Sequence, residues 1–148
     1  MAKYARNMNE IYKALDKTMY NLANMAGDKV KELIDSFIML YYNNYTPKSN
    51  GYIRTYQFLE SCIRSKVIKE GNGYYVMVYI DTANLDYEEA TGEQVVDWAN
   101  QGLHGGMDVG DDVRFWDESM DMLINKGYLV KLFSEYLKKN GLKVTITR

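Results

Sequence analysis

Apolar residues recur at steps of three and four from about Asn9 to Asn43, and this pattern constrains the chain more than any other. Such spacing places them on one face of a helix. The predicted helix is roughly 35 residues, about 50 Å at the standard rise. That is longer than a small core covers, so we expect one end to project or to dock on a neighbour. The face comprises Ile11, Leu15, Met19, Leu22, Ala26, Val30, Leu33, Phe37 and Leu40.

Two features bear on the bounds and continuity of this helix. Asn7 or Asn9 can cap its start, and Gly27 is a weak point that can bend or split it. A coiled coil is the alternative interpretation, although the apolar spacing is not a strict heptad.

The single proline, Pro47, ends the helical pattern. It disfavours the helical conformation of Thr46, and the following pair Asn50-Gly51 tolerates a positive φ. A different kind of structure therefore begins here, and residues 52–62 have the spacing of a short helix.

A β-hairpin is predicted next. The β-rich runs 63–70 and 74–81 flank the turn Gly71-Asn72-Gly73. In the second run Val76, Val78 and Ile80 face one side, and Tyr75, Met77 and Tyr79 face the other. Both faces are apolar, so we expect helices against one and a partner against the other.

The remaining chain alternates helical and irregular patterns. Thr91 and Gln94 have capping-box spacing, which predicts a short helix over 92–101 that Gly102 ends. A flexible loop follows over 102–112. The last helical region begins at Phe115, dips at 125–127 and stops at Gly141, and the alternation over 142–147 predicts a terminal strand.

These elements predict an α+β fold with a small antiparallel sheet built on the central hairpin. We expect a single domain over residues 1–148, with a helical segment over 1–45 and a strand-helix body over 46–148. The net charge of −2 and the mixing of 18 basic with 20 acidic residues are not typical of a dedicated nucleic-acid or membrane binder. The 14 tyrosines suit surfaces buried against a partner, but AT-rich coding bias also produces them.

Candidate chemistry is sparse. Cys62 with His104 and Asp97 or Asp117 resembles a thiolate site only in residue types, and a buried inert thiol is the preferred interpretation. His104 is expected to be a turn or interface residue. One histidine and one cysteine cannot supply the usual ligands of zinc, and the loop carboxylates lack EF-hand spacing. We therefore predict no enzyme activity, no catalytic, cofactor-binding or metal-binding residues, no cofactor and no small-molecule substrate.

Basic residues gather around the proline turn and the first hairpin run. They form either a solvated strand face, which we prefer, or a positive rim that faces nucleic acid or an acidic partner. The cluster comprises Lys48, Arg54, Arg64, Lys66 and Lys69.

Three blocks in this order resemble a known family. They are residues 47–54 closing at Ser61, the strand ending in 76–80, and Arg114-Phe115-Trp116-Asp117-Glu118-Ser119-Met120 leading into the final helix. The pattern resembles that of the tail-completion, or head-tail joining, proteins of long-tailed bacteriophages. The resemblance implies a structural virion protein of the tail or neck, assembled in the host cytoplasm, that forms rings, commonly six-fold, between tail tube and head.

Expected partners are further copies of the chain, tail-tube, tail-terminator or neck (connector) proteins, and DNA passing through the lumen, with no membrane. The alternative function is a small nucleic-acid-binding or regulatory protein of a mobile element. The candidate partner-interface residues are Pro47, Gly51, Arg54, Tyr75, Met77, Tyr79, His104, Phe115 and Trp116.

Overall fold

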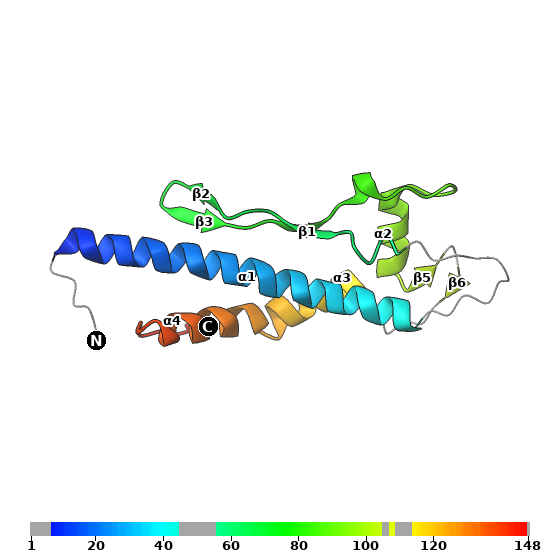
Figure 1. Cartoon of the computed structure of the whole chain (residues 1–148). Helices are drawn as coiled ribbons and strands as arrows, with labels where there is room; N and C mark the ends of the chain where they lie inside the picture. Colours follow the sequence, from blue (N-terminus) through cyan, green and yellow to red (C-terminus); the bar gives the residue numbers. More distant parts are fainter. Residues whose placement is uncertain (1–6, 45–55, 105–106, 109–113, 148) are drawn as a thin grey trace.

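The computed structural model describes residues 7–44, 56–104, 107–108 and 114–147. Its longest element is helix α1 (Met8–Asn44), whose 37 residues run along most of the length of the molecule (Figure 1). The Asn7 side chain accepts a hydrogen bond from the Glu10 N–H at 3.0 Å, so Asn7 caps the helix. The predicted long N-terminal helix is confirmed.

Gly27 neither bends nor splits α1, which continues through it as one element. At this position the helix and the hairpin instead approach each other closely. A Cβ placed on Gly27 would lie 2.6 Å from Cγ1 of Val76 in the hairpin. The glycine therefore lets the hairpin lie directly on the helix.

The predicted hairpin is present as two antiparallel ladders on one side of α1 (Figure 1). Strand β1 (Cys62–Arg64) pairs with β4 (Val78–Ile80), and β2 (Ile68–Glu70) pairs with β3 (Gly73–Tyr75). The register shifts by one residue between the ladders, so residues 65–67 form a bulge opposite residues 76–77. At the bulge the Ser65 N–H donates to the Met77 carbonyl, and the Ser65 hydroxyl accepts from the Met77 N–H.

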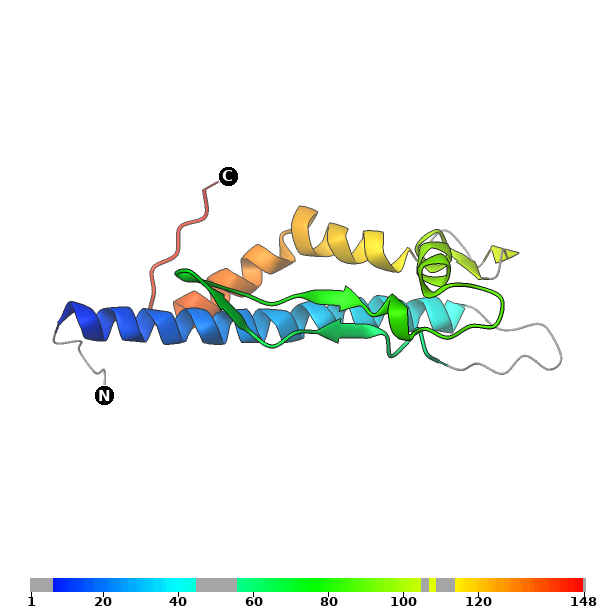
Figure 2. The ribbon, with the colours of Figure 1, turned by 90° about the horizontal axis from the view of Figure 1, so that it is seen from above.

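Helices cover the other side of α1. Helix α3 (Phe115–Met120) continues through the π-helical η2 (Asp121–Asn125) to α4 (Tyr128–Lys139), which runs back beside α1 (Figures 1 and 2). Gly127, with φ +72°, makes the predicted break, and Gly141, with φ +82°, follows the end of α4. The predicted α+β fold is confirmed.

Shorter elements lie near the end of α1. They are η1 (Thr82–Asn84), α2 (Gly92–Asn100) and the paired strands β5 (Leu103–His104) and β6 (Met107–Asp108). The helix predicted over 92–101 is confirmed. The flexible loop predicted over 102–112 is wrong for the four residues of β5 and β6, and its residues 105–106 and 109–112 lie outside the described residues.

Two other predictions are wrong where the structure describes them. The short helix predicted to end at residue 62 is only a turn from Tyr56 onward, because Tyr56 has φ 57°, outside the helical region. Residues 142–147 pair with no strand of the described chain, although their apolar and polar residues alternate.

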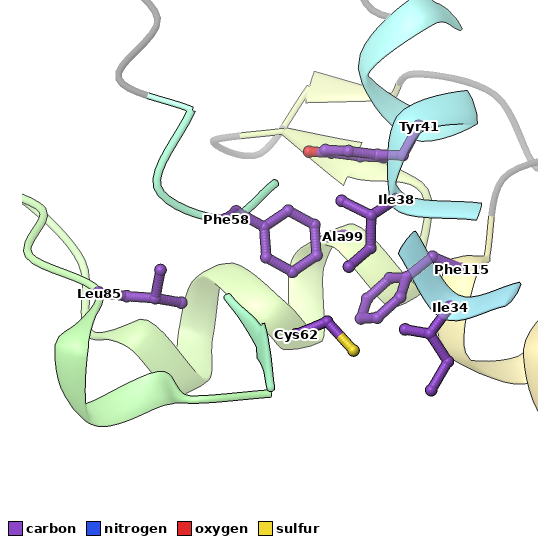
Figure 3. Close-up of a cluster of buried hydrophobic side chains, with 8 residues drawn as sticks. All are labelled: Ile34, Ile38, Tyr41, Phe58, Cys62, Leu85, Ala99 and Phe115. Carbon is purple, nitrogen blue, oxygen red and sulfur yellow. The ribbon is translucent and has the colours of Figure 1, made fainter. Parts of the chain in front are cut away.

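The core lies where α1, the hairpin base, α2 and α3 meet (Figure 3). The rings of Phe58 and Phe115 pack edge to face, 5.0 Å apart between centroids. Burying such rings supplies much of the hydrophobic stabilisation of a small core. The buried cluster consists of Ile34, Ile38, Tyr41, Phe58, Cys62, Leu85, Ala99 and Phe115.

Candidate assembly interface

A largely apolar groove of about 350 Å³ opens between β4, α2 and α3. Tyr79 and Ile80 form one wall, Val96 stands on α2, and Trp116 comes from the first turn of α3. Its polar lining residues are Thr82, Glu93, Asp97 and Asn100. An apolar floor with a few polar groups at its edge is typical of a binding groove.

Helix α2 is fixed against this groove by its first residues. Thr91 and Gln94 form the predicted capping box, with hydrogen bonds of 2.9 and 3.3 Å between side chains and backbone. The adjoining Gly92 is buried, and a Cβ there would lie 2.1 Å from the Thr82 carbonyl oxygen. No larger residue fits this contact, so the glycine sets how closely α2 approaches η1.

The rim of the groove is acidic. Glu93 and Asp97 stand one helical turn apart on α2, and neither has an ion-pair partner among the residues described. The backbone N–H of Glu93, and then the Thr82 hydroxyl at 3.1 Å, lower the pKa of the Glu93 carboxyl. Glu93 is therefore ionised at neutral pH.

Asn100 joins the end of α2 to the start of α3. Its side-chain oxygen accepts from the backbone N–H groups of Trp116, at 3.0 Å, and Asp117, at 3.1 Å. Its amide nitrogen donates to the Asp117 carboxylate at 3.1 Å. These bonds satisfy N–H groups that begin a helix and hold the Trp116 side chain at the groove. Sequence reasoning missed Asn100, because its partners lie beyond a long intervening loop.

The outer face of the hairpin is also apolar and uncovered. Tyr75, Met77 and Tyr79 are 40, 49 and 44% exposed, whereas Val76, Val78 and Ile80 on the opposite face are half-buried. The predicted division of the strand into two faces is confirmed, with α1 on the inner side.

The structure brings together two of the candidate interface residues, Tyr79 and Trp116, which line the same groove. Phe115 is a correction: it is fully buried in the core, because its ring packs on Phe58, and it offers no surface to a partner. The backbone of His104 belongs to β5, but its side chain lies outside the described part. Three further candidates, Pro47, Gly51 and Arg54, also lie outside the described residues.

The hairpin is attached to α1 by polar contacts that the sequence did not reveal. Near the hairpin base, Arg64 forms an ion pair with Asp28 at 2.7 Å and donates to Asn24 at 3.0 Å. Although Arg64 belongs to the predicted basic cluster, its charge is used within the fold.

A second attachment lies near the hairpin tip. The Asp16 carboxylate accepts from the Tyr74 hydroxyl at 2.7 Å and from Lys69 at 3.1 Å. These hydrogen bonds, with that from Tyr74 the larger cause, lower the pKa of Asp16. The Tyr20 ring packs edge to face on the Tyr74 ring, with 5.8 Å between their centroids.

Cys62 is a core residue and is only 2% exposed. Burial, and then the negative charge of Asp35, raise the pKa of this thiol to about 12. It is therefore a neutral thiol at physiological pH and not an activated nucleophile. In the described part of the chain, no group of three or more histidine, cysteine, aspartate or glutamate residues could hold a metal ion.

No helix within the described ranges combines the length and apolar character that crossing a membrane requires. No curated protein and no solved structure matches the chain. A family model described as YomN, a family of phage regions of Bacillus, matches residues 7–139. The chain thus belongs to the YomN family and is associated with phage, as its resemblance to phage proteins predicted.

Proposed function

We propose that this chain is a structural protein of the phage particle that acts in tail completion, joining the tail tube to the head or neck as part of a homo-oligomeric ring. It acts by assembly and catalyses no reaction. Its partners are further copies of itself and tail-tube, tail-terminator or neck proteins. The family match supports the phage context, and the proposed place in the particle rests on the resemblance of the three sequence blocks.

The observation that carries an assembly role is the uncovered start of α1. The apolar stripe of this helix is covered where the hairpin and α4 flank it, as at Leu22 and Ala26, which are 4 and 7% exposed. Toward its start, α1 projects beyond both neighbours (Figures 1 and 2). From this projecting start to the level of the hairpin tip, the same stripe is 38 to 61% exposed at Met8, Ile11, Tyr12, Leu15 and Met19.

A continuous apolar surface of this kind is costly in water and marks a contact with another molecule. The outer hairpin face and the groove, which share Tyr79, add further uncovered apolar surface away from the start of α1. Different surfaces that meet different neighbours are what a head-to-tail ring requires.

The nucleic-acid alternative receives less support. Two cations of the basic cluster form ion pairs with α1, since Arg64 pairs with Asp28 and Lys69 with Asp16. A surface that binds phosphates needs cations free to replace counterions. Arg64 and Lys69 therefore fasten the hairpin to the helix.

The test is to disrupt the gene in a phage that encodes this chain and to examine the lysate by electron microscopy. We expect separate heads and tails in place of joined particles, and expression of the chain in trans should restore joining. Tailed, infectious particles that form without the chain would overturn the proposal.

A point variant tests whether the exposed stripe is used. Leu15→Asp should abolish this rescue, whereas the matched control Asn21→Asp, at an exposed position off the stripe, should retain it. Circular dichroism of both purified variants checks that the fold is kept.

A further inference from the structure

The extended segment of residues 142–147 leaves α4 without a strand partner in the described chain and points away from α1 (Figure 2). Its apolar residues alternate with polar ones, so Leu142, Val144 and Ile146 share one face when it is extended. Ile146 is 55% exposed. The segment has the pattern of a strand that is half-buried, but the strand that would pair with it is missing.

A strand edge that could pair with this segment lies at the groove: it is the free edge of β4. Strand β4 pairs only with β1 among the described strands, and its other edge lies on the side of α3 (Figure 2). The Asp81 N–H donates to the Ser61 carbonyl across the ladder at 2.8 Å. Along a strand, the backbone N–H and C=O groups of alternate residues point to the same edge. Because Asp81 points toward β1, Ile80 and Val78 direct their N–H and C=O groups to the opposite, free edge.

The two surfaces are complementary in charge. The groove has at its rim the carboxylates of Glu93 and Asp97, neither of which forms an ion pair with a described residue. The segment carries Lys143, and Arg148 follows it in the sequence. Apolar residues that enter the groove would thus be accompanied by cations that meet its acidic rim.

The segment cannot reach the groove of its own chain. The helical path from Phe115, beside the groove, to Lys139 is about 35 Å long at the standard rise and leads away from the groove. Residues 140–147, which follow Lys139, span at most about 28 Å when fully extended. An occupant with this sequence must come from another copy.

We propose that residues 142–147 of one copy add as a strand to the free edge of β4 in the next copy, with Leu142, Val144 and Ile146 in the groove. The contact is heterologous, since it joins different surfaces of the two chains, and it can therefore continue around a ring. The proposal deepens the assembly function and rests on it.

The test measures self-association of the full-length chain by sedimentation equilibrium. Ile146→Asp should raise the dissociation constant at least about tenfold, because it places a charge where the proposed contact buries an isoleucine. The matched control is Ile124→Asp, since Ile124 is an isoleucine 67% exposed outside the segment, and it should associate like the wild type.

Charge reversal identifies the groove as the acceptor. Lys143→Glu and Asp97→Lys should each weaken association several-fold, and the double variant should recover most of the loss. A wild-type chain that stays monomeric up to about 1 mM, equal effects of Ile146→Asp and Ile124→Asp, or a double variant weaker than either single variant would overturn the inference.

The outcome is separable from that of the proposed function. If the chain joins heads to tails in the phage and Ile146→Asp leaves both joining and association unchanged, only this contact is wrong. If association depends on Ile146 but phage particles form without the chain, the assembly is real and its place in the particle is wrong.

Discussion

Val76 of the hairpin lies directly over Gly27 of α1, so closely that a Cβ on the glycine would be 2.6 Å from Val76 Cγ1 and 3.3 Å from its Cβ. The glycine weakens the helix locally, since glycine is about 1 kcal/mol less favourable than alanine within a helix. The contact explains why a glycine stands at the middle of the longest element. It also fixes where the hairpin meets the helix.

Gly27→Ala should therefore destabilise the fold despite its better helix propensity, by about 1–3 kcal/mol, because the added methyl group overpacks the contact. Urea unfolding followed by circular dichroism gives the free energy. In the Val76→Ala background the same change should cost much less or become favourable. Gly73→Ala is the control, because a Cβ there would meet only the Glu70 carbonyl oxygen at 3.7 Å. An additive double variant would contradict the proposed overpacking.

The Arg64–Asp28 ion pair should contribute measurably to hairpin attachment. The Arg64 side chain is only 23% exposed and has Asn24 as a second acceptor. Arg64→Ala should lower the free energy of unfolding by about 1–2 kcal/mol, and a double-mutant cycle with Asp28→Ala should give a favourable coupling energy. Lys66→Ala, on the same run but exposed and without an ion pair to any described residue, should change little. Zero coupling would show that the pair contributes nothing to stability.

Asp16 should make the fold sensitive to acid. Its pKa is below the ordinary value of 3.8, chiefly because of the Tyr74 hydroxyl and then Lys69. A carboxyl whose folded pKa is depressed contributes stability that is present above its unfolded pKa and is lost as pH falls through the folded pKa. The melting temperature should thus fall more between pH 5 and about pH 3 in the wild type than in Asp16→Asn. Parallel curves for the two proteins would contradict this role.

Local signals made much of the fold predictable. The spacing of apolar residues predicted α1, the glycine-rich turn predicted the hairpin, and the pair Thr91 and Gln94 predicted the start of α2. Each of these depends on residues close together in the chain. Gly27 was misread because the contact that explains it comes from Val76, which is distant in sequence.

The same limit applies to the candidate site. Tyr79 and Trp116 were each recognised as surface candidates, but nothing in the sequence places them in one groove. That placement depends on Asn100, which ties α2 to the start of α3. The alternation of residues 142–147 predicted a strand that the structure does not form, because a strand also needs a partner and the described chain supplies none.

Gly92 offers the sharpest test of how the groove is built. A Cβ there would lie 2.1 Å from the Thr82 carbonyl oxygen and 2.9 Å from its carbon, and backbone atoms cannot move aside as a flexible side chain can. Gly92→Ala should therefore push α2 away from η1, and it should lower the free energy of unfolding by about 2–4 kcal/mol. Thr91→Ala is the matched control, because it removes only the cap of the same helix and should cost about 1 kcal/mol. The fluorescence of Trp116 reports the groove directly once Trp98 is replaced by phenylalanine in each protein. Gly92→Ala should shift the emission of Trp116, whereas Thr91→Ala should leave it unchanged. Equal, small losses of stability in the two variants would show that α2 can adjust and that Gly92 does not set the width of the groove.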